Sequence, residues 1–360
     1  MQIVIFVLML SVLVLVHEFG HFIMARLFKM RVEEFGIGLP PRARKLFTNK
    51  GTLFSLNWLP IGGFVKLFGE DMDDPAQAGS PEAFFNKPVW QRAGVLTAGV
   101  VMNFLLGVFA FGIVYTYLGI PTKTDKVIVV EVGKNTPAEA AGIKTESQIT
   151  KVTFENKEIV FSGVSGFIKQ IEPLKGKEIE LTLLQKGGKE EVIKIVPRLT
   201  PPQGEGALGV ALSDMEMKMY PIWQRPFRGV VVGVTESWAW GKEITVSLGK
   251  LLWGILTGKG VPKDVAGPIG IYQVSKQVYK VGWIATLQFM AILSINLAIL
   301  NIMPFPALDG GRVFFLGIEK IIGKRLKNRI EGYIHTVGMF FLIGLMLLIT
   351  VRDVIKLVRP

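Results

Sequence analysis

Four long apolar stretches without Lys, Arg, Asp or Glu constrain this 360-residue chain more than any other feature. They cover residues 1–17, 93–122, 281–308 and 332–351, and the first resumes after Glu18 as far as Ala25. A helix needs roughly 20 apolar residues to cross a hydrocarbon core of about 30 Å. The mean hydropathy of +0.42 is also high for a soluble enzyme of this length. The sequence therefore predicts a polytopic α-helical membrane protein with four transmembrane helices, the first over 1–25.

The distribution of basic residues orients the predicted spans. The loop 26–92 carries ten Lys and Arg residues and the loop 309–331 carries six, including the basic run 324–329. Short basic loops stay in the cytoplasm, so both termini and the long segment 123–280 are expected on the extracytoplasmic side. The basic tail, with Arg352, Lys356 and Arg359, argues weakly for the opposite orientation. The N-terminal stretch has neither a preceding basic residue nor a small-residue cleavage site, which favours a retained helix over a signal peptide.

Composition also limits the partners and the chemistry. The net charge of +12 is spread over several loops beside the spans, so a lipid bilayer is the expected partner and no nucleic acid is expected. The chain has no cysteine. A bound metal would therefore be held by His, Asp or Glu.

The segments between the spans predict further structure. Residues 53–59 and 64–68 favour strands and flank Pro60-Ile61-Gly62-Gly63, which predicts a β-hairpin over 52–68 that is apolar enough to lie against the bilayer. Residues 69–81 are predicted to form a loop. Residues 126–199 predict a small α+β domain with strands at 127–132, 149–154, 179–185 and 192–196 and helices at 136–141 and 163–171. Residues 200–280 predict a linker followed by interfacial amphipathic helices, one of them over 228–257.

His17, Glu18 and His21 form the pattern HExxH at the end of the first apolar stretch. Residues four apart lie on one face of a helix, so two imidazoles can share one metal ion, typically zinc, while the glutamate deprotonates a water molecule. Ionisable residues in a membrane span are costly and usually face a polar cavity or one another. The sequence therefore predicts a zinc site inside the bilayer, near its cytoplasmic face, with Glu18 as the catalytic base.

A third metal ligand has several candidates. Soluble enzymes of this type often use a glutamate further along the chain, which nominates Glu33 or Glu34, and His335 is the remaining histidine. Asp309 is favoured because it follows prolines that unwind the third span on the same side as His21. A helix cap is the simpler reading of Asp309. Asn301 could be a polar packing residue or a donor to a substrate carbonyl group.

The sequence resembles the site-2 protease family, in particular the bacterial RseP/RasP-type intramembrane zinc metalloproteases with one PDZ domain. The matching segments are spread over nearly the whole chain: the HExxH pattern, 60–66, 85–92 with Ala98-Gly99 and Asn103-Phe104, 267–271 and 301–311. The resemblance implies a zinc metalloendopeptidase of regulated intramembrane proteolysis in the bacterial inner membrane. The implied substrates are single-span proteins such as anti-sigma factor fragments, or remnant signal peptides.

The resemblance also implies roles for individual residues. His17, His21 and Asp309 would bind zinc, Glu18 would be the general base, and Asn301 would contact the substrate. The hairpin, with Gly62, Gly63 and Phe64, would receive the substrate as an added strand. Residues 126–199 would form an extracytoplasmic PDZ domain.

Two positions depart from the family pattern, and two other functions are open. Val100 stands where the family often has proline, and 141–147 lacks the usual glycine-aspartate pair, so this domain either binds peptide termini or acts as a size filter. Intramembrane histidines and acids also occur in metal-ion transporters, and a PDZ protein can be a non-catalytic membrane scaffold. Glu18 discriminates, because hydrolysis requires a base there.

Overall fold

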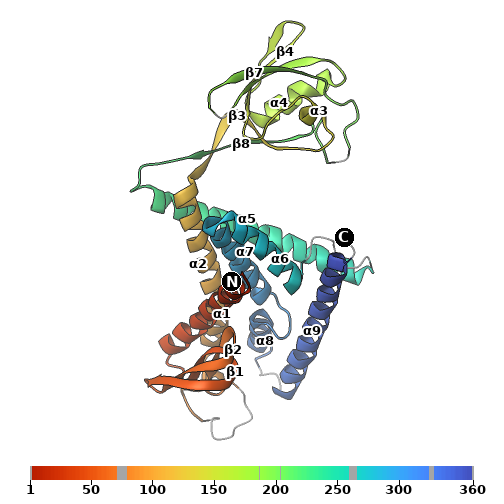
Figure 1. Cartoon of the computed structure of the whole chain (residues 1–360). Helices are drawn as coiled ribbons and strands as arrows, with labels where there is room; N and C mark the ends of the chain where they lie inside the picture. Colours follow the sequence, from red (N-terminus) through yellow and green to blue (C-terminus); the bar gives the residue numbers. More distant parts are fainter. Residues whose placement is uncertain are drawn as a thin grey trace. The chain divides into compact units, whose positions relative to one another are not determined.

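The computed structural model describes residues 2–70, 79–185, 187–202, 204–258, 266–323 and 328–358. It divides into two compact units, one formed by Met1–Tyr117 with Pro226–Pro360 and the other by Leu118–Arg225 (Figure 1). Most of the predicted loop 69–81, residues 324–327 of the basic run and Arg359 lie outside the described residues.

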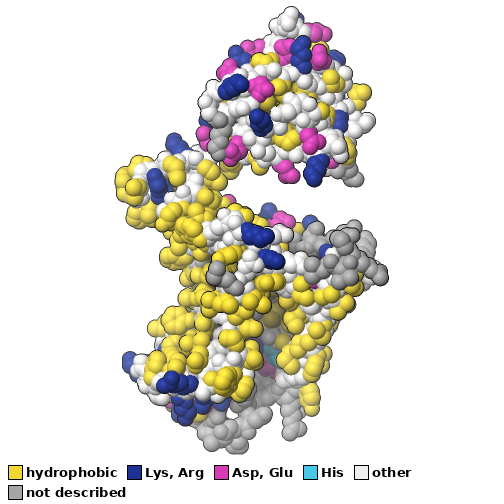
Figure 2. Space-filling view, viewed as in Figure 1, with side chains coloured by type: hydrophobic (Ala, Val, Ile, Leu, Met, Phe, Trp, Pro, Cys, Tyr) yellow, Lys and Arg dark blue, Asp and Glu magenta, His cyan; other side chains and the backbone are white. Residues whose placement is uncertain are grey.

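Four of the described helices are long and apolar enough to cross a membrane. They are α1 (Gln2–Leu27), α2 (Val89–Leu118), α7 (Trp283–Ile302) and α9 (Asn328–Val358). In α9 the part that could cross a membrane is Glu331–Lys356. All four predicted apolar spans are therefore confirmed as helices. Two end earlier than predicted, α2 before Gly119 with its φ of 100° and α7 before Pro304, which cannot donate a helical hydrogen bond. Figure 2 shows apolar side chains over most of the visible face of the first unit.

The hairpin predicted over 52–68 is wrong in its extent and its turn. The hairpin consists of β1 (Val32–Asn49) and β2 (Thr52–Leu67), and Asn49 lies opposite Thr52. Lys50 and Gly51 form the turn with φ of 46° and 81°, as a two-residue hairpin loop requires. The segment around Pro60 continues within β2. Sequence reasoning missed β1 because its prolines and charges are atypical of a strand.

The two strands bend, so that the first part of β1 lies between two parts of β2. Ile37 faces Gly63 on one side and Leu56 on the other. Residues 63–67 of β2 consequently pair with β1 on one side and, among the described residues, with no strand on the other. The Val65 N–H on this open edge donates to Glu18 of α1 at 3.1 Å, so the edge lies along α1. Gly62 and Gly63 also approach this helix closely, because an added Cβ would lie 3.1 Å from Val14 and 2.7 Å from Leu15, respectively.

Residues 309–331, predicted as a loop, begin with the helix α8 (Asp309–Ile322). The two glycines in its first turn lower helix propensity, which explains the wrong prediction. Packing compensates: the buried Arg92 of α2 donates to Glu319 of α8 at 2.6 Å, and Arg312 of α8 pairs with Glu70. These ion pairs hold α8 against α2 and the end of the hairpin.

Two further helices, α5 (Arg225–Leu256) and α6 (Pro268–Val281), precede α7. The helix predicted over 228–257 is confirmed, whereas its interfacial position remains a prediction. Gly229 and Gly233 let α5 cross α2 closely. A Cβ on Gly229 would lie 2.5 Å from the Gly112 oxygen, and a Cβ on Gly233 would lie 2.4 Å from the Val108 oxygen. At the start of α6, Asp353 of α9 accepts hydrogen bonds from two glycine N–H groups, each at 2.9 Å.

The second unit contains a sheet in the order β7-β6-β4-β3-β8, with β5 attached to β4. Its strands are β3 (Ile120–Val132), β4 (Gln148–Phe154), β5 (Lys157–Ile159), β6 (Ile179–Leu184), β7 (Glu190–Ile195) and β8 (Val210–Lys218), and its helices are α3 (Pro137–Ala140) and α4 (Gly163–Ile171). The four predicted strands and both predicted helices are confirmed. Short 3-10 turns occur at Phe84–Asn86 in the first unit and Glu172–Leu174 in the second.

The predicted domain boundary at 199 is wrong, because β8 belongs to the sheet and pairs with β3, placing Leu212 opposite Val129. The sequence of β8 mixes apolar and charged residues, so its strand character depends on this distant partner. The core of the unit contains fully buried apolar side chains that include Val127, Ile149, Phe167 and Leu181.

Candidate metal centre and active site

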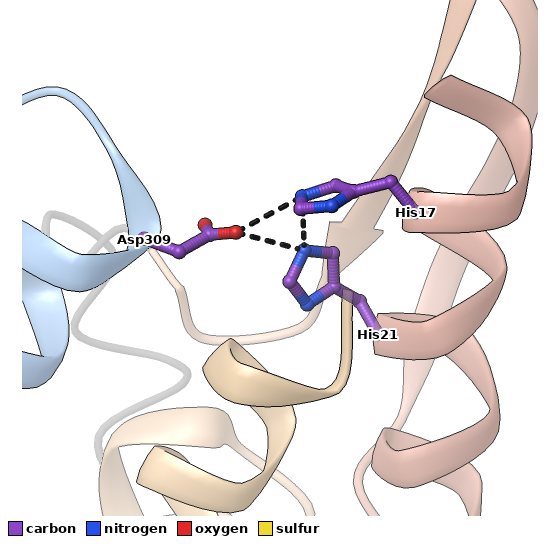
Figure 3. Close-up of side chains that lie close together, drawn as sticks. All are labelled: His17, His21 and Asp309. Atoms are coloured by element: carbon purple, nitrogen blue, oxygen red, sulfur yellow. Dashed lines mark hydrogen bonds and ion pairs between the residues drawn. The ribbon is translucent and has the colours of Figure 1, made fainter. Parts of the chain in front are cut away.

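The imidazoles of His17 and His21 lie one turn apart on the same face of α1 and are both buried. Their Nε2 atoms are 3.1 Å apart, and the rings meet edge to face. Figure 3 shows that both point toward Asp309, whose Oδ2 atom lies 3.0 Å from Nε2 of His17 and 3.3 Å from Nε2 of His21. A carboxylate almost 300 residues away in the sequence thus completes a compact cluster.

Asp309 reaches this position because the chain turns sharply after α7. It is the first residue of α8, and Leu308 occupies the N-cap position without a side-chain hydrogen bond. The Asp309 carboxylate contacts the imidazoles, so the simpler reading of this residue as a helix cap is wrong. In the described part of the chain, His17, His21 and Asp309 form the one group of three or more His, Asp or Glu side chains that could hold a metal ion.

The other candidates for a third ligand have different partners. Glu33 pairs with Lys66 at 2.9 Å, and His335 accepts a hydrogen bond from the Ala307 N–H. Glu34 accepts from Ser55 and from Arg42. Burial alone would raise the pKa of Glu34, but these hydrogen bonds outweigh it and hold the pKa below its ordinary value. None of these three side chains joins the cluster.

The cluster fits a zinc ion in both donor type and spacing. Donor atoms about 2.0–2.1 Å from a tetrahedral zinc ion stand about 3.4 Å apart, and the three observed separations are 3.0, 3.1 and 3.3 Å. Two imidazole nitrogens and one carboxylate oxygen are a typical catalytic donor set that leaves a fourth position open.

Hydrogen bonds at the opposite ring nitrogens orient the imidazoles. The Nδ1–H of His21 can donate to the Val95 carbonyl at 2.8 Å, which leaves the Nε2 lone pair free for a metal. Nδ1 of His17 lies 3.3 Å from the amide nitrogen of Asn103, a fully buried residue whose Oδ1 has no partner among the described residues. Amide orientation is assigned from the hydrogen-bond network. Rotating this amide by 180° lets Oδ1 accept a hydrogen bond from His17 Nδ1–H.

Asn103 received no individual role from the sequence. The sequence nevertheless indicates that Asn103 has a polar partner, because an asparagine inside an apolar span is costly without one.

Glycines make room for the cluster between α1 and α2. A Cβ on Gly99 would lie 2.6 Å from Nε2 of His21 and 2.7 Å from Cε1 of His17. A Cβ on Gly20 would lie 2.4 Å from the Ala98 oxygen. The helix backbones therefore approach closely enough for α2 to form one wall of the site.

Glu18 is half-buried and lies beside the open edge of β2. Its Oε2 accepts a hydrogen bond from the Val65 N–H at 3.1 Å. Gly62, Gly63 and Phe64 immediately precede this contact. Asn301 lies in the last turn of α7 and, in the described part of the chain, makes no hydrogen bond to the three clustered side chains. The structure thus brings the hairpin residues to Glu18 and leaves a role for Asn301 untested.

Four apolar helices long enough to cross a membrane and a cluster of two histidines and one aspartate that fits a metal ion together describe a multi-pass membrane protein with a candidate metal site. The chain belongs to peptidase family M50, whose family model matches residues 5–345. It is an intramembrane zinc metalloprotease of the site-2 type.

Relatives in several bacteria are similar over nearly their whole length. A protein from Clostridium acetobutylicum named as a candidate zinc metalloprotease is 33% identical over 354 residues, which cover 98% of this chain and 97% of the relative. The zinc metalloprotease RasP of Oceanobacillus iheyensis is 28% identical over 433 positions, which cover 99% of each chain. RasP of Geobacillus kaustophilus is 27% identical, covering 99% of this chain and 98% of the relative.

Proposed function

We propose that His17, His21 and Asp309 hold the zinc ion and that Glu18 is the general base for hydrolysis of peptide bonds in membrane-spanning segments. The observation that carries this proposal is the convergence of three donor atoms from α1 and α8, mutually 3.0–3.3 Å apart. Glu18 follows His17 directly, so the helix fixes the base beside the ligands.

The chain's own residues account for the proton transfers. When bound, zinc supplies Lewis acidity that makes water more acidic and polarises a carbonyl group. Glu18 accepts the proton of the attacking water on its carboxylate and returns that proton to the amine of the leaving peptide. The Val65 N–H holds Oε2 of Glu18 and leaves Oε1 available for this proton.

The open edge of β2 supports a model for substrate binding. A transmembrane helix hides its peptide bonds in its own hydrogen bonds and must be extended before attack. Residues 63–67 have one side paired with β1, and the other side faces α1 at Glu18. We propose that an extended substrate segment adds to this edge, near Gly62, Gly63 and Phe64. Asn301, at the end of α7, is proposed to contact the substrate.

The substrates and the cellular arrangement are also proposals. Single-span proteins such as anti-sigma factor fragments, or remnant signal peptides, are the proposed substrates, in a bacterial inner membrane. Both termini and the second unit would be extracytoplasmic, since 26–92 and 309–331 are the most basic short loops. The second unit is proposed to be a PDZ domain that binds peptide termini or excludes large substrates.

Cleavage of a model single-span substrate by the purified chain tests the catalytic proposal. Glu18→Gln should retain zinc and lose hydrolysis by at least about 100-fold, because a general base contributes 10²–10⁴ in rate. A metal-ion transporter or a scaffold has no strict need for a base here. Wild-type cleavage by Glu18→Gln would contradict the role of Glu18.

The absence of cysteine allows a direct test of orientation. One variant would carry a single cysteine at Lys50 in the hairpin turn, and another at Lys134 in the second unit. Cells stripped of their outer envelope but with an intact inner membrane would be treated with a membrane-impermeant maleimide. The proposed orientation predicts labelling at position 134 alone. Labelling at position 50 instead would reverse it.

A further inference from the structure

The turn that delivers Asp309 has an unusual backbone. Residues 303–308 connect α7 to α8, and Ala307 has a φ of 77°. This left-handed conformation is uncommon for residues other than glycine, asparagine and aspartate, and it persists where surrounding structure imposes it. The conformation of this turn must therefore be held by contacts from outside it.

The turn is rigidly coupled to the first turn of α8. A Cβ on Gly310 would lie 2.2 Å from the Met303 oxygen, and one on Gly311 would lie 2.2 Å from the Phe305 oxygen. Asp309 is directly next to both contacts. A shift of the 303–308 turn would therefore displace the Asp309 carboxylate from the imidazoles.

One face of α9 supplies the outside contacts. Nδ1 of His335 accepts a hydrogen bond from the Ala307 N–H at 2.8 Å. Gly338 lies against Pro306, where a Cβ would be 2.5 Å from the proline Cβ and 2.8 Å from its oxygen. The Phe341 ring lies 5.7 Å from the Phe305 ring. Because positions 335, 338 and 341 are three residues apart, they share one side of the helix.

The His335 ring has a second contact besides the Ala307 N–H. Accepting at Nδ1 requires a neutral ring with its hydrogen on Nε2; Nε2 lies 3.8 Å from Glu331, beyond hydrogen-bond distance, and has no hydrogen-bond partner among the described residues. The ring also packs edge to face on Phe315 of α8, at 5.6 Å between centroids. His335 thus contacts both the turn before Asp309 and the helix after it.

We infer that His335, together with Gly338, positions the third zinc ligand: the hydrogen bond to Ala307 keeps the 303–308 turn in the one conformation that presents Asp309 to His17 and His21. Zinc binding then depends on the docking of α9, a helix that supplies no ligand. This inference rests on the proposed role of Asp309.

Zinc affinity of the purified full chain, measured by competition with a chromogenic chelator, tests the inference independently of activity. His335→Phe keeps a ring without the acceptor and should weaken zinc binding about 10- to 100-fold, as loss of a supporting hydrogen bond does elsewhere. His335→Asn carries an oxygen near the position of Nδ1 and should stay within about threefold of wild type. This rescue separates the acceptor from ring packing.

A matched glycine pair on α9 supplies a second measurement if His335→Phe does not fold. Gly338→Ala would clash with Pro306 and should weaken zinc binding, whereas Gly344→Ala meets no atom within 4 Å and should not. Wild-type affinity in both His335→Phe and Gly338→Ala would overturn the inference. So would an Asn variant as weak as the Phe variant. Failure of the proposed function is distinguishable from failure of this inference. If Asp309 is not a zinc ligand, Asp309→Ala binds zinc with the same affinity as wild type.

Discussion

Substitution of Gly99 by alanine should remove the zinc site while leaving the fold intact. The added methyl carbon would lie 2.6 Å from Nε2 of His21, and 2.7 and 2.8 Å from Cε1 and Nδ1 of His17. Ordinary contacts between such atoms need about 3.5 Å, so either the rings or α2 must move by roughly 0.7–0.9 Å. Metal sites tolerate deviations of about 0.2 Å in ligand distance. We therefore expect zinc affinity to fall at least 100-fold, together with proteolysis.

Gly112→Ala is the matched control for this prediction. It lies on the same helix, and its added carbon would meet the nearest atom at 3.4 Å, an ordinary contact. Chelator competition and circular dichroism on both variants separate loss of metal from loss of fold. If Gly99→Ala binds zinc like wild type, the proposed packing of α2 against the imidazoles is wrong.

Substitutions at three other positions test the supports of the site and of the fold. Asn103→Leu should weaken zinc binding about 10- to 100-fold by leaving His17 Nδ1 without a partner. Asn103→Asp keeps an acceptor and should therefore bind zinc more tightly than Asn103→Leu in the same chelator assay. The ion pair of Glu34 with Arg42 should stabilise the chain above the unfolded pKa of the carboxyl group, near 4.3, and lose that effect as pH falls through the lower folded pKa. The thermal unfolding midpoints of Arg42→Met and wild type should therefore differ at pH 7 and converge in acid. An equal difference at both pH values would refute this. Asp353→Ala leaves two N–H groups of α6 without their charged acceptor and should cost about 2–4 kcal/mol of stability, seen as a lower unfolding midpoint; an unchanged midpoint would exclude the contact.

Several features of the site could be predicted from local sequence because each has a local cause. The spacing of His17 and His21 follows from helix geometry, and the prolines before Asp309 end the third span, although α7 ends earlier than predicted. The position of Asp309 at the end of the third span, on the same side as His21, favoured it over Glu33 and Glu34, and the structure gives both glutamates other partners.

Other features depend on contacts between distant segments. β1 and β8 are strands because of their partners. The two glycines in the first turn of α8 are compatible with a helix because the 303–308 turn packs against them. The support from Asn103 and His335 likewise arises in three dimensions. A lone polar residue in an apolar span signals a buried partner but does not identify it.

Zinc stoichiometry of the purified chain is the most direct test of the three-ligand site. Mass spectrometry of metals in wild type, His21→Ala and Asp309→Ala should give one zinc per wild-type chain and well below one in both variants after dialysis against a weak chelator. A full equivalent of zinc in Asp309→Ala would show that this carboxylate is not a ligand.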